Sequence, residues 1–234
     1  MAETVARVIE RVRDRLDEAF ERQWTDRQLR SWIIEGSEDL ARRSLQLLDT
    51  VNVTAIAATP EYTITESVLE IHGAYWYPTG DGRRVPLQPK QFQAMDNVWW
   101  TERDRQTASD PVFFTTWGFP PALKLRVFPA PASGGTIQLM VSRLPAKFDL
   151  TGLDDADPID IPAGWSDLLV EYAEMCALRK DRDPRWQEPK ALYEEKLMAM
   201  ISNGNALTQG GEFIYDGPGG FLPGWLVNPD GGWW

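Results

Sequence analysis

The spacing of apolar residues changes period twice along this chain of 234 residues, and this change limits the folds open to it. Over residues 1–48 apolar side chains recur every three or four positions, as in amphipathic helices, and the same spacing returns over residues 162–202. Between them apolar and polar residues alternate, as in half-buried strands. Neither pair of helices can bury its apolar face alone, so the pairs must pack together. The sequence predicts an α+β fold, a four-helix bundle with an inserted antiparallel β domain and an extended C-terminal arm.

The first two predicted helices carry recognisable signals. Thr25 begins the second helix, and Gln28 three residues later completes a capping box. Gly36 lies on its apolar face and costs about 1 kcal/mol relative to alanine, which indicates a close crossing with another helix. The first helix carries Arg7, Arg11 and Arg15 at a spacing of four. These could form a stripe for DNA, but acidic residues run alongside them, which favours an ion-paired face toward solvent or another subunit.

The middle of the chain predicts a small antiparallel sheet or sandwich. Strand-like runs occupy residues 51–55, 61–64, 71–77, 112–117, 123–128 and 136–144. Prolines and glycines separate these runs, and residues 90–98 could form a short helix. Two further helices follow, separated by a break at residues 181–184. The resulting division is a helical bundle of residues 1–48 with 162–202, an inserted β domain with its linking loop at 49–161, and an arm at 203–234.

The last segment differs in composition from the rest of the chain. Residues 203–234 contain nine glycines, three prolines and six aromatic residues, and they have no lysine or arginine. Such a segment shows no hydrophobic period and cannot form a core by itself. Exposed aromatic side chains are nevertheless typical of interfaces. We therefore expect a docking arm that inserts its aromatic side chains into a neighbouring subunit or a partner. These side chains are Phe213, Tyr215, Phe221, Trp225, Trp233 and Trp234.

Composition excludes several function classes. With 24 basic and 35 acidic residues the formal net charge is −11, which opposes charge-driven nucleic-acid binding. The single cysteine, Cys176, and the single histidine, His72, exclude a cysteine-based zinc site and make a histidine relay improbable. We interpret both as structural. The acidic run at residues 154–160 lacks the glycine and closing glutamate of a calcium loop. No enzyme activity, cofactor or metal site is predicted, and no run of about 18 apolar residues suggests a membrane span.

Several segments together resemble a known family. They are TDRQLRSWIIEG at 25–36, LARR at 40–43, PEYTI at 60–64, LKLRVFPAP at 123–131, GGTIQL at 134–139 and IPAGWSDLLVEYA at 161–173. Their order and spacing over residues 1–202 resemble the head-to-tail adaptor (connector) proteins of tailed bacteriophages. The glycine- and tryptophan-rich tail departs from the common pattern of that family, so its contacts do not carry over.

The resemblance implies a structural protein of the virion, made in the host cytoplasm and located at the head-tail junction. It implies a ring of about twelve copies that joins the portal protein to the tail or nozzle protein. Genomic DNA would pass through the lumen of this ring without sequence-specific binding, and there would be no catalysis. An acidic protein fits such a role independently, because it repels phosphates that must slide past.

Two other function classes remain open from the residues alone. The first is a carbohydrate- or peptide-binding β module on a helical stalk in a phage tail, with tryptophans as stacking platforms. The second is an enzyme, such as a glycosidase of the tail apparatus. Four amphipathic helices around the sheet argue against the module, and no pair of residues marks an active site. Tight sugar binding by the isolated protein would favour the module, and turnover would favour the enzyme.

Overall fold

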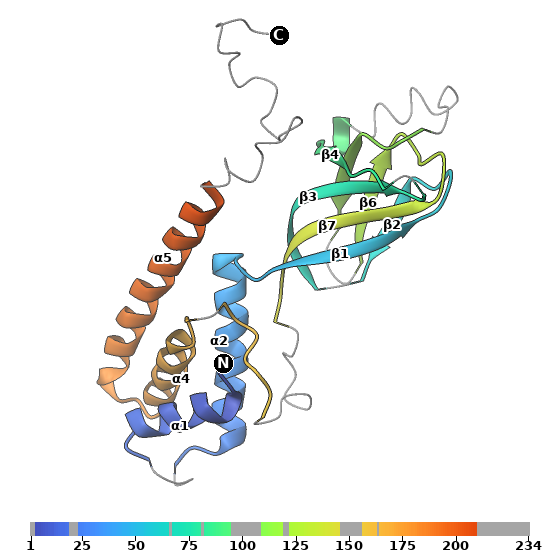
Figure 1. The fold of residues 1–234 in the computed structure, drawn as a ribbon. Coiled ribbons are helices and arrows are strands. Elements are labelled where there is room, and N and C mark those ends of the chain that lie inside the picture. The colour runs from blue at the N-terminus through green and yellow to red at the C-terminus, as the bar shows by residue number, and fades with distance from the viewer. Residues whose placement is uncertain are drawn as a thin grey trace, which may run out of the picture.

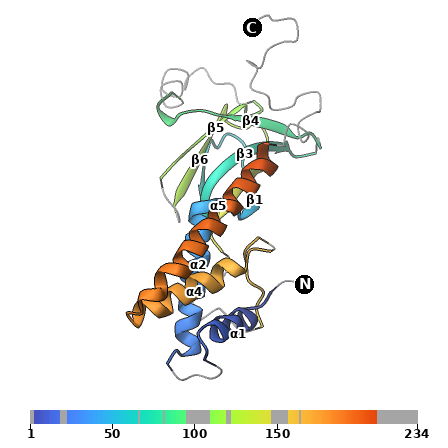
Figure 2. The ribbon, with the colours of Figure 1, turned by 90° about the vertical axis from the view of Figure 1, so that its left-hand side faces the viewer.

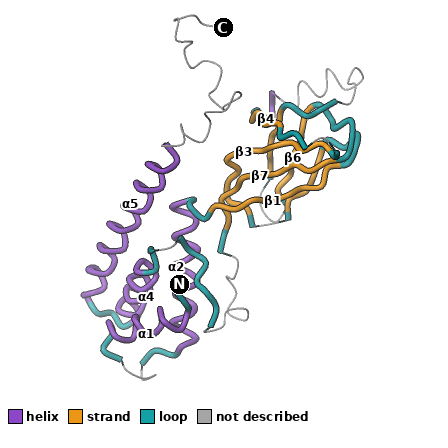
Figure 3. The backbone as a smooth tube through the Cα atoms, in the orientation of Figure 1, coloured by secondary structure: helices purple, strands orange, loops and turns teal. Residues whose placement is uncertain are grey.

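A computed structural model describes residues 3–18, 23–65, 67–80, 82–94, 109–118, 122–145, 156–162 and 164–209. The helices lie together on one side and the strands on the other, as Figure 1 and Figure 3 show. The chain passes from the helices to the strands after α2 and returns to the helices after β7. The α+β class predicted from the change in period is therefore confirmed.

The first two helices form where the apolar period predicts them. In α1 (Val5–Arg15) the side chains of Val5, Val8 and Val12 are buried. In α2 (Asp26–Ser44) the predicted capping box is present. The Thr25 hydroxyl accepts a bond from the Gln28 backbone N–H, and the Gln28 side chain accepts one from the Thr25 N–H. These bonds satisfy two backbone groups that a helix start otherwise leaves without partners.

The C-terminal helices follow the predicted break. Helix α4 (Asp167–Lys180) ends before a short 3-10 helix, η2 (Pro184–Trp186), and α5 (Gln187–Gln209) continues from it. Proline, which has no backbone N–H, is tolerated at the start of η2. The N–H groups in the first turn of a helix have no carbonyl partner within the helix, so none is lost. Helix α5 runs past the predicted end at residue 202, so the first part of the expected arm, residues 203–209, is helical. Residues 203–209 show no hydrophobic period, so they were not predicted to be helical. A helix can nevertheless continue through residues that have no apolar stripe.

The helices pack around α4, which contacts α1, α2 and α5. Gly36 of α2 lies against Tyr172 of α4, and a Cβ atom at Gly36 would lie 2.9 Å from the Tyr172 ring. The predicted close crossing at Gly36 is thereby confirmed. A four-helix bundle is not what the structure shows, because α1 lies across α2 (Figure 1) and α5 extends beyond the shorter α4 (Figure 2). Apolar periodicity predicts which face a helix buries but not the angle at which it crosses its neighbour.

Seven strands form one near-barrel sheet in the order β1-β7-β3-β4-β5-β6-β2. They are β1 (Leu48–Ala55), β2 (Glu61–Ile64), β3 (Val68–Pro78), β4 (Val85–Pro89), β5 (Phe113–Trp117), β6 (Leu123–Phe128) and β7 (Gly135–Arg143). All neighbouring strands pair antiparallel except β4 and β5, which pair in parallel over two positions. The predicted antiparallel sheet is thus confirmed apart from this one pair.

Strand β4 was not predicted, because Pro86 and Pro89 indicate turns in a sequence. The structure accommodates both prolines. The backbone N–H groups of Gln88 and Lys90 donate to the carbonyls of Val112 and Phe114. The nitrogen of Pro89 therefore points away from β5, and pairing with β5 begins only at Gln88, beyond Pro86. Proline is compatible with a strand where its nitrogen faces no partner.

The sheet encloses its own buried cluster, separate from those of the helices. Trp76, Leu87 and Leu125 are fully buried inside it. The helical residues form two further clusters, one centred on α1, α2 and α4 and one between α4 and α5. The helical part and the sheet therefore each have a hydrophobic core of their own.

Candidate interaction surfaces

The residues expected to dock lie outside the described part of the chain. Phe213, Tyr215, Phe221, Trp225, Trp233 and Trp234 all follow Gln209, the last residue of α5. The place from which they continue is nevertheless defined. The Gln46 side chain donates from Nε2 to the carbonyl of Met200 at 2.7 Å, and Gly204 lies against the same side chain. The C-terminal turns of α5 are therefore held beside the passage from α2 to β1.

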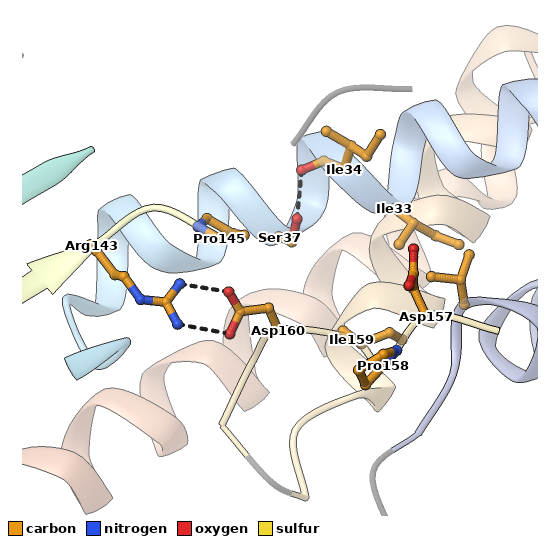
Figure 4. A pocket seen from close by; sticks show the side chains of 10 residues that line it. Ile33, Ile34, Ser37, Arg143, Pro145, Asp157, Pro158, Ile159 and Asp160 are labelled. Carbon is orange, nitrogen blue, oxygen red and sulfur yellow. Dashed lines mark hydrogen bonds and ion pairs between the residues drawn. The ribbon is translucent and has the colours of Figure 1, made fainter. Parts of the chain in front are cut away.

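An arginine ties the sheet to the helices at this passage. Arg143, at the end of β7, donates from Nε to Asp49 of β1 at 2.6 Å. Its two terminal nitrogens bond to the carboxylate of Asp160 at 2.5 and 3.1 Å (Figure 4). A backbone bond from Thr50, followed by the bond from Arg143, lowers the pKa of Asp49. Both chain passages between the helices and the sheet therefore meet at one charged, bidentate contact.

A hollow of about 570 Å³ opens beside this contact (Figure 4). Its wall is mostly apolar and comes from α1, α2, the end of β7 and the loop before α4. The residues are Val5, Ile33, Ile34, Ser37, Arg143, Pro145, Asp157, Pro158, Ile159 and Asp160. Ser37 donates its hydroxyl to the Ile34 carbonyl at 2.8 Å, and Asp160 is held by Arg143. The hollow offers an apolar wall, and its described lining contains no cysteine, histidine or lysine that could act as a nucleophile or base.

Ion pairs between α1 and α4 account for two of the arginines of the first helix. Arg11 bonds to Asp167 and, at 2.9 Å, to Glu3, and Arg15 reaches Glu174 at 3.0 Å. The hydrogen bond from Arg11 lowers the pKa of Asp167. The predicted ion pairing is thus confirmed for Arg11 and Arg15, but this face of α1 lies against α4 of the same chain rather than toward solvent or another subunit. Their partners lie on α4, 156 and 159 residues away in sequence. The spacing of residues within α1 could not reveal such distant partners.

The single histidine and the single cysteine have structural surroundings. The His72 ring lies 2.5 Å from the Ser142 hydroxyl through Nε2, and Ser142 donates in turn to the carbonyl of Leu45. This chain links β3 and β7 to the end of α2. Burial, and then the charge of Glu35, raise the pKa of the Cys176 thiol to about 11, so the thiol stays protonated and unreactive at neutral pH. Among the described residues no group of three His, Cys, Asp or Glu side chains is placed to hold a metal ion.

The described tryptophans line the margins of the cores more than their centres. Only Trp24 and Trp76 are buried, while Trp32, Trp117, Trp165 and Trp186 are half-buried. Trp24 and Trp32 pack edge to face with ring centres 5.3 Å apart, and Lys180 lies over both rings. Trp32 and Trp165 pack against the buried clusters of the helices, so four of the six described tryptophans lie in or against a core.

One surface does not follow from the predicted elements, the free edge of β1. Among the described strands, β1 pairs with β7 alone and forms one end of the strand order. Most of its residues are exposed, whereas the short β2 at the other end buries alternate residues. A run of β-branched residues without proline or lysine was the available signal, because natural edge strands usually carry such protecting residues.

Comparison with known proteins supplies the identity that the geometry leaves open. In the described part of the chain no helix is long and apolar enough to span a membrane. No curated protein matches the sequence. The family model for the SU10 adaptor protein matches residues 3–212, which is nearly the whole chain. The segments that suggested a phage head-tail adaptor thus all lie within the match. The chain belongs to the SU10 adaptor family of bacteriophage structural proteins, and it is a virion component.

Proposed function

We propose that this protein forms a closed ring of about twelve copies that joins the portal to the tail. The observation that carries the proposal is the family match over residues 3–212. Copies in a ring contact one another through two different surfaces, because only a heterologous contact can close a circle of this kind. The portal binds one face of the ring, and the tail or nozzle protein binds the other.

Within each copy we assign different tasks to the parts of the chain. Residues 1–48 and 162–202 act as one helical unit, with residues 49–161 inserted as a β unit. The contacts of α4 with α1, α2 and α5 support this division. Residues beyond α5 serve as the docking arm, whose aromatic side chains enter a neighbouring subunit or the portal. Burying a large aromatic side chain contributes roughly 2–3 kcal/mol, so a few such anchors can outweigh the cost of ordering the short segments around them.

The lumen of the ring serves as part of the DNA channel. The net charge of −11 supports this role, because an acidic protein gives sliding DNA no excess of cations to bind. DNA then passes without sequence-specific contact. Catalysis has no part in this function.

Electron microscopy tests the proposal directly. The purified full-length protein is imaged alone and after mixing with its cognate portal rings, over a range of salt concentrations. We expect a ring bound to one end of the portal, with the protein alone either monomeric or already in rings. Failure to form any complex with the portal under all salt conditions would overturn the proposal. A parallel binding assay with phage-receptor polysaccharide separates the adaptor from a sugar-binding module, which would bind tightly.

A further inference from the structure

The free edge of β1 has the geometry of an acceptor for another strand. Pairing with β7 uses the backbone groups of alternate residues, since the Arg143 N–H donates to the Leu47 carbonyl in the same register. Residues 49, 51, 53 and 55 therefore face β7, and the backbone groups of residues 48, 50, 52 and 54 face outward. Within the described chain, the outward N–H groups of Leu48 and Thr50 are taken by local bonds to Gln46 and Asp49. Outward carbonyls and the N–H groups of Asn52 and Thr54 remain for a partner strand.

This edge lacks the devices that normally prevent pairing. Over its eight residues β1 has no proline, no lysine and no bulge against β7. Its single charge, Asp49, is held by Arg143 rather than directed at an approaching strand. Valine and threonine supply half of its residues, and both favour extended backbone. An edge of this kind pairs readily with an extended peptide.

Exposed apolar side chains lie beside the same edge. Leu48 and Ile56, at and just beyond the two ends of β1, are 59% and 63% exposed. Met140, which pairs with Thr50 from the neighbouring strand, is 39% exposed. A strand added beside β1 would cover part of Leu48 and Ile56 at the two ends of the edge, while Met140 lies one strand farther in.

We propose that β1 accepts residues 212–216 of the C-terminal arm of the next copy as an additional strand. The run Glu212-Phe213-Ile214-Tyr215-Asp216 combines aromatic and β-branched residues, and glycines flank it on both sides. The arm starts close to β1, because Gln46 holds the last turns of α5 beside the passage into that strand. Only residues 210 and 211 separate Gln209 from this run, so an extended chain places Glu212 within roughly 11 Å of Gln209 and Asp216 within roughly 25 Å. The pairing therefore requires that the β1 edge of the adjoining copy lies close to the end of α5.

This pairing supplies a contact of the type that the ring requires. The arm and the β1 edge are different surfaces of one chain, so their exchange between successive copies is head-to-tail and can close a circle. The inference rests on the proposed function for its assignment to the next copy. It also divides the work within the arm. Backbone pairing at residues 212–216 holds the arm in place, and the aromatic residues beyond it remain available for other contacts.

A labelled peptide of residues 210–218 tests the pairing on the monomeric fraction of the full-length protein, in which no neighbouring copy occupies β1. The peptide should bind wild-type protein, and Asn52→Pro should weaken binding at least about tenfold, because proline removes the outward N–H without touching the ladder to β7. The matched control is Asn52→Ala, which loses the same side-chain contact with Gln138 and should bind within about twofold of wild type. Circular dichroism checks that both variants fold.

Modified peptides keep the test independent of any protein variant. A strand paired on one side uses the N–H groups of alternate residues only. Methylating the backbone nitrogen of Ile214, or those of Phe213 and Tyr215, should therefore abolish binding in one of the two peptides and spare it in the other. Equal effects of both methylations, equal effects of both Asn52 variants, or no binding of the unmodified peptide would each overturn the inference. The last outcome includes occupation of β1 by the chain's own arm.

The outcomes also separate this inference from the proposed function. Rings that form on the portal while the peptide fails to bind would refute the pairing and leave the adaptor role intact. If the peptide binds but no ring forms on the portal, the strand pairing stands and the adaptor role is refuted. If Asn52→Pro prevents ring formation although the peptide does not bind, β1 pairs with some other strand, and the assignment of the arm is wrong.

Discussion

Single residues at the helix crossings decide how closely the helices approach. Gly36 allows α2 to lie directly on Tyr172 of α4, with the ring of Tyr172 stacked edge to face on Tyr193 of α5. Three helices therefore meet around a position that has no side chain. Glycine has a lower helix propensity than alanine, which costs free energy in α2. The close packing of α2 on α4, possible because glycine has no Cβ, offsets this cost.

Replacing this glycine tests which effect is larger. A Cβ at Gly36 would lie 2.9 Å from Tyr172 Cγ and 3.2 Å from its Cβ, atoms too close to the α4 backbone to rotate away. Overpacking costs about 1–3 kcal/mol, and alanine gains about 1 kcal/mol in helix propensity. We expect Gly36→Ala to lower the free energy of unfolding by about 1 kcal/mol and Gly36→Val by about 3 kcal/mol in chemical denaturation. The control Glu35→Ala should change it by less than about 0.5 kcal/mol. Stabilisation by Gly36→Ala would contradict the close packing.

The pair of Arg11 and Asp167 gives the helices a dependence on acid. The hydrogen bond from Arg11 lowers the pKa of Asp167 in the folded protein. A carboxyl with a lowered pKa stabilises the fold above its unfolded pKa, near 4, and loses this contribution as the pH falls through the folded value. Asp167→Asn should therefore reduce the free energy of unfolding at pH 7 by roughly 0.5 kcal/mol, a small value because the carboxylate is half exposed and screened.

The measurement is chemical denaturation of wild type and variant at pH 7 and pH 3. The difference between the two proteins should be smaller at pH 3 than at pH 7, because the contribution of Asp167 is lost as the pH falls toward and through its lowered folded pKa. Asp14→Asn, at an exposed position of α1, serves as the control and should show no such convergence. A difference that is the same at both pH values would show that the asparagine acts through packing rather than charge.

Among the elements, β7 and the loop before α4 are joined by Arg143. This one side chain contacts Asp49 of β1 and Asp160 of the loop, so it holds the sheet against the helical part. Arg143→Met should lower the free energy of unfolding by about 1–2 kcal/mol, because it removes the charged hydrogen bonds of Arg143 to Asp49 and Asp160. Arg143→Lys should restore less than half of the loss, since lysine cannot make the bidentate contact. Full recovery by lysine in denaturation experiments would show that charge alone suffices.

For the whole molecule the question is whether the arm belongs to the fold or to the assembly. The described cores draw on residues up to Ile201 of α5, and none of their members lies beyond it. Deleting residues 210–234 should therefore shift the melting temperature by no more than about 2 °C, which corresponds to less than 1 kcal/mol for a chain of this size. The same deletion should abolish attachment to the portal or ring formation in electron microscopy. Unfolding of the truncated protein would instead make the arm part of the core.

Local periodicity alone determined a large share of the fold. Some features depend on residues only three or four positions apart, and these can be read directly from the sequence. They are the apolar stripe of α1, the capping box at Thr25 and the position of Gly36 on the apolar face of α2. The alternation over β3, β6 and β7 placed those strands within a few residues of their observed ends. The family segments likewise consist of contiguous residues.

The tertiary structure decided what depends on distant partners. Strand β4 forms although it contains Pro86 and Pro89. Neither proline nitrogen faces a residue of a neighbouring strand that would need a hydrogen bond from it. Several contacts join residues that meet only after the chain returns from the sheet. They include the ion pair of Arg11 with Asp167 and the bonds of Arg143 to Asp160. The angle at which α1 crosses α2 (Figure 1) is likewise set by the tertiary packing. The free edge of β1 exists because the sheet stops one pairing short of closing on β2. A sequence carries the preference of each segment, but which backbone groups remain unpaired follows only from how the segments are arranged in space.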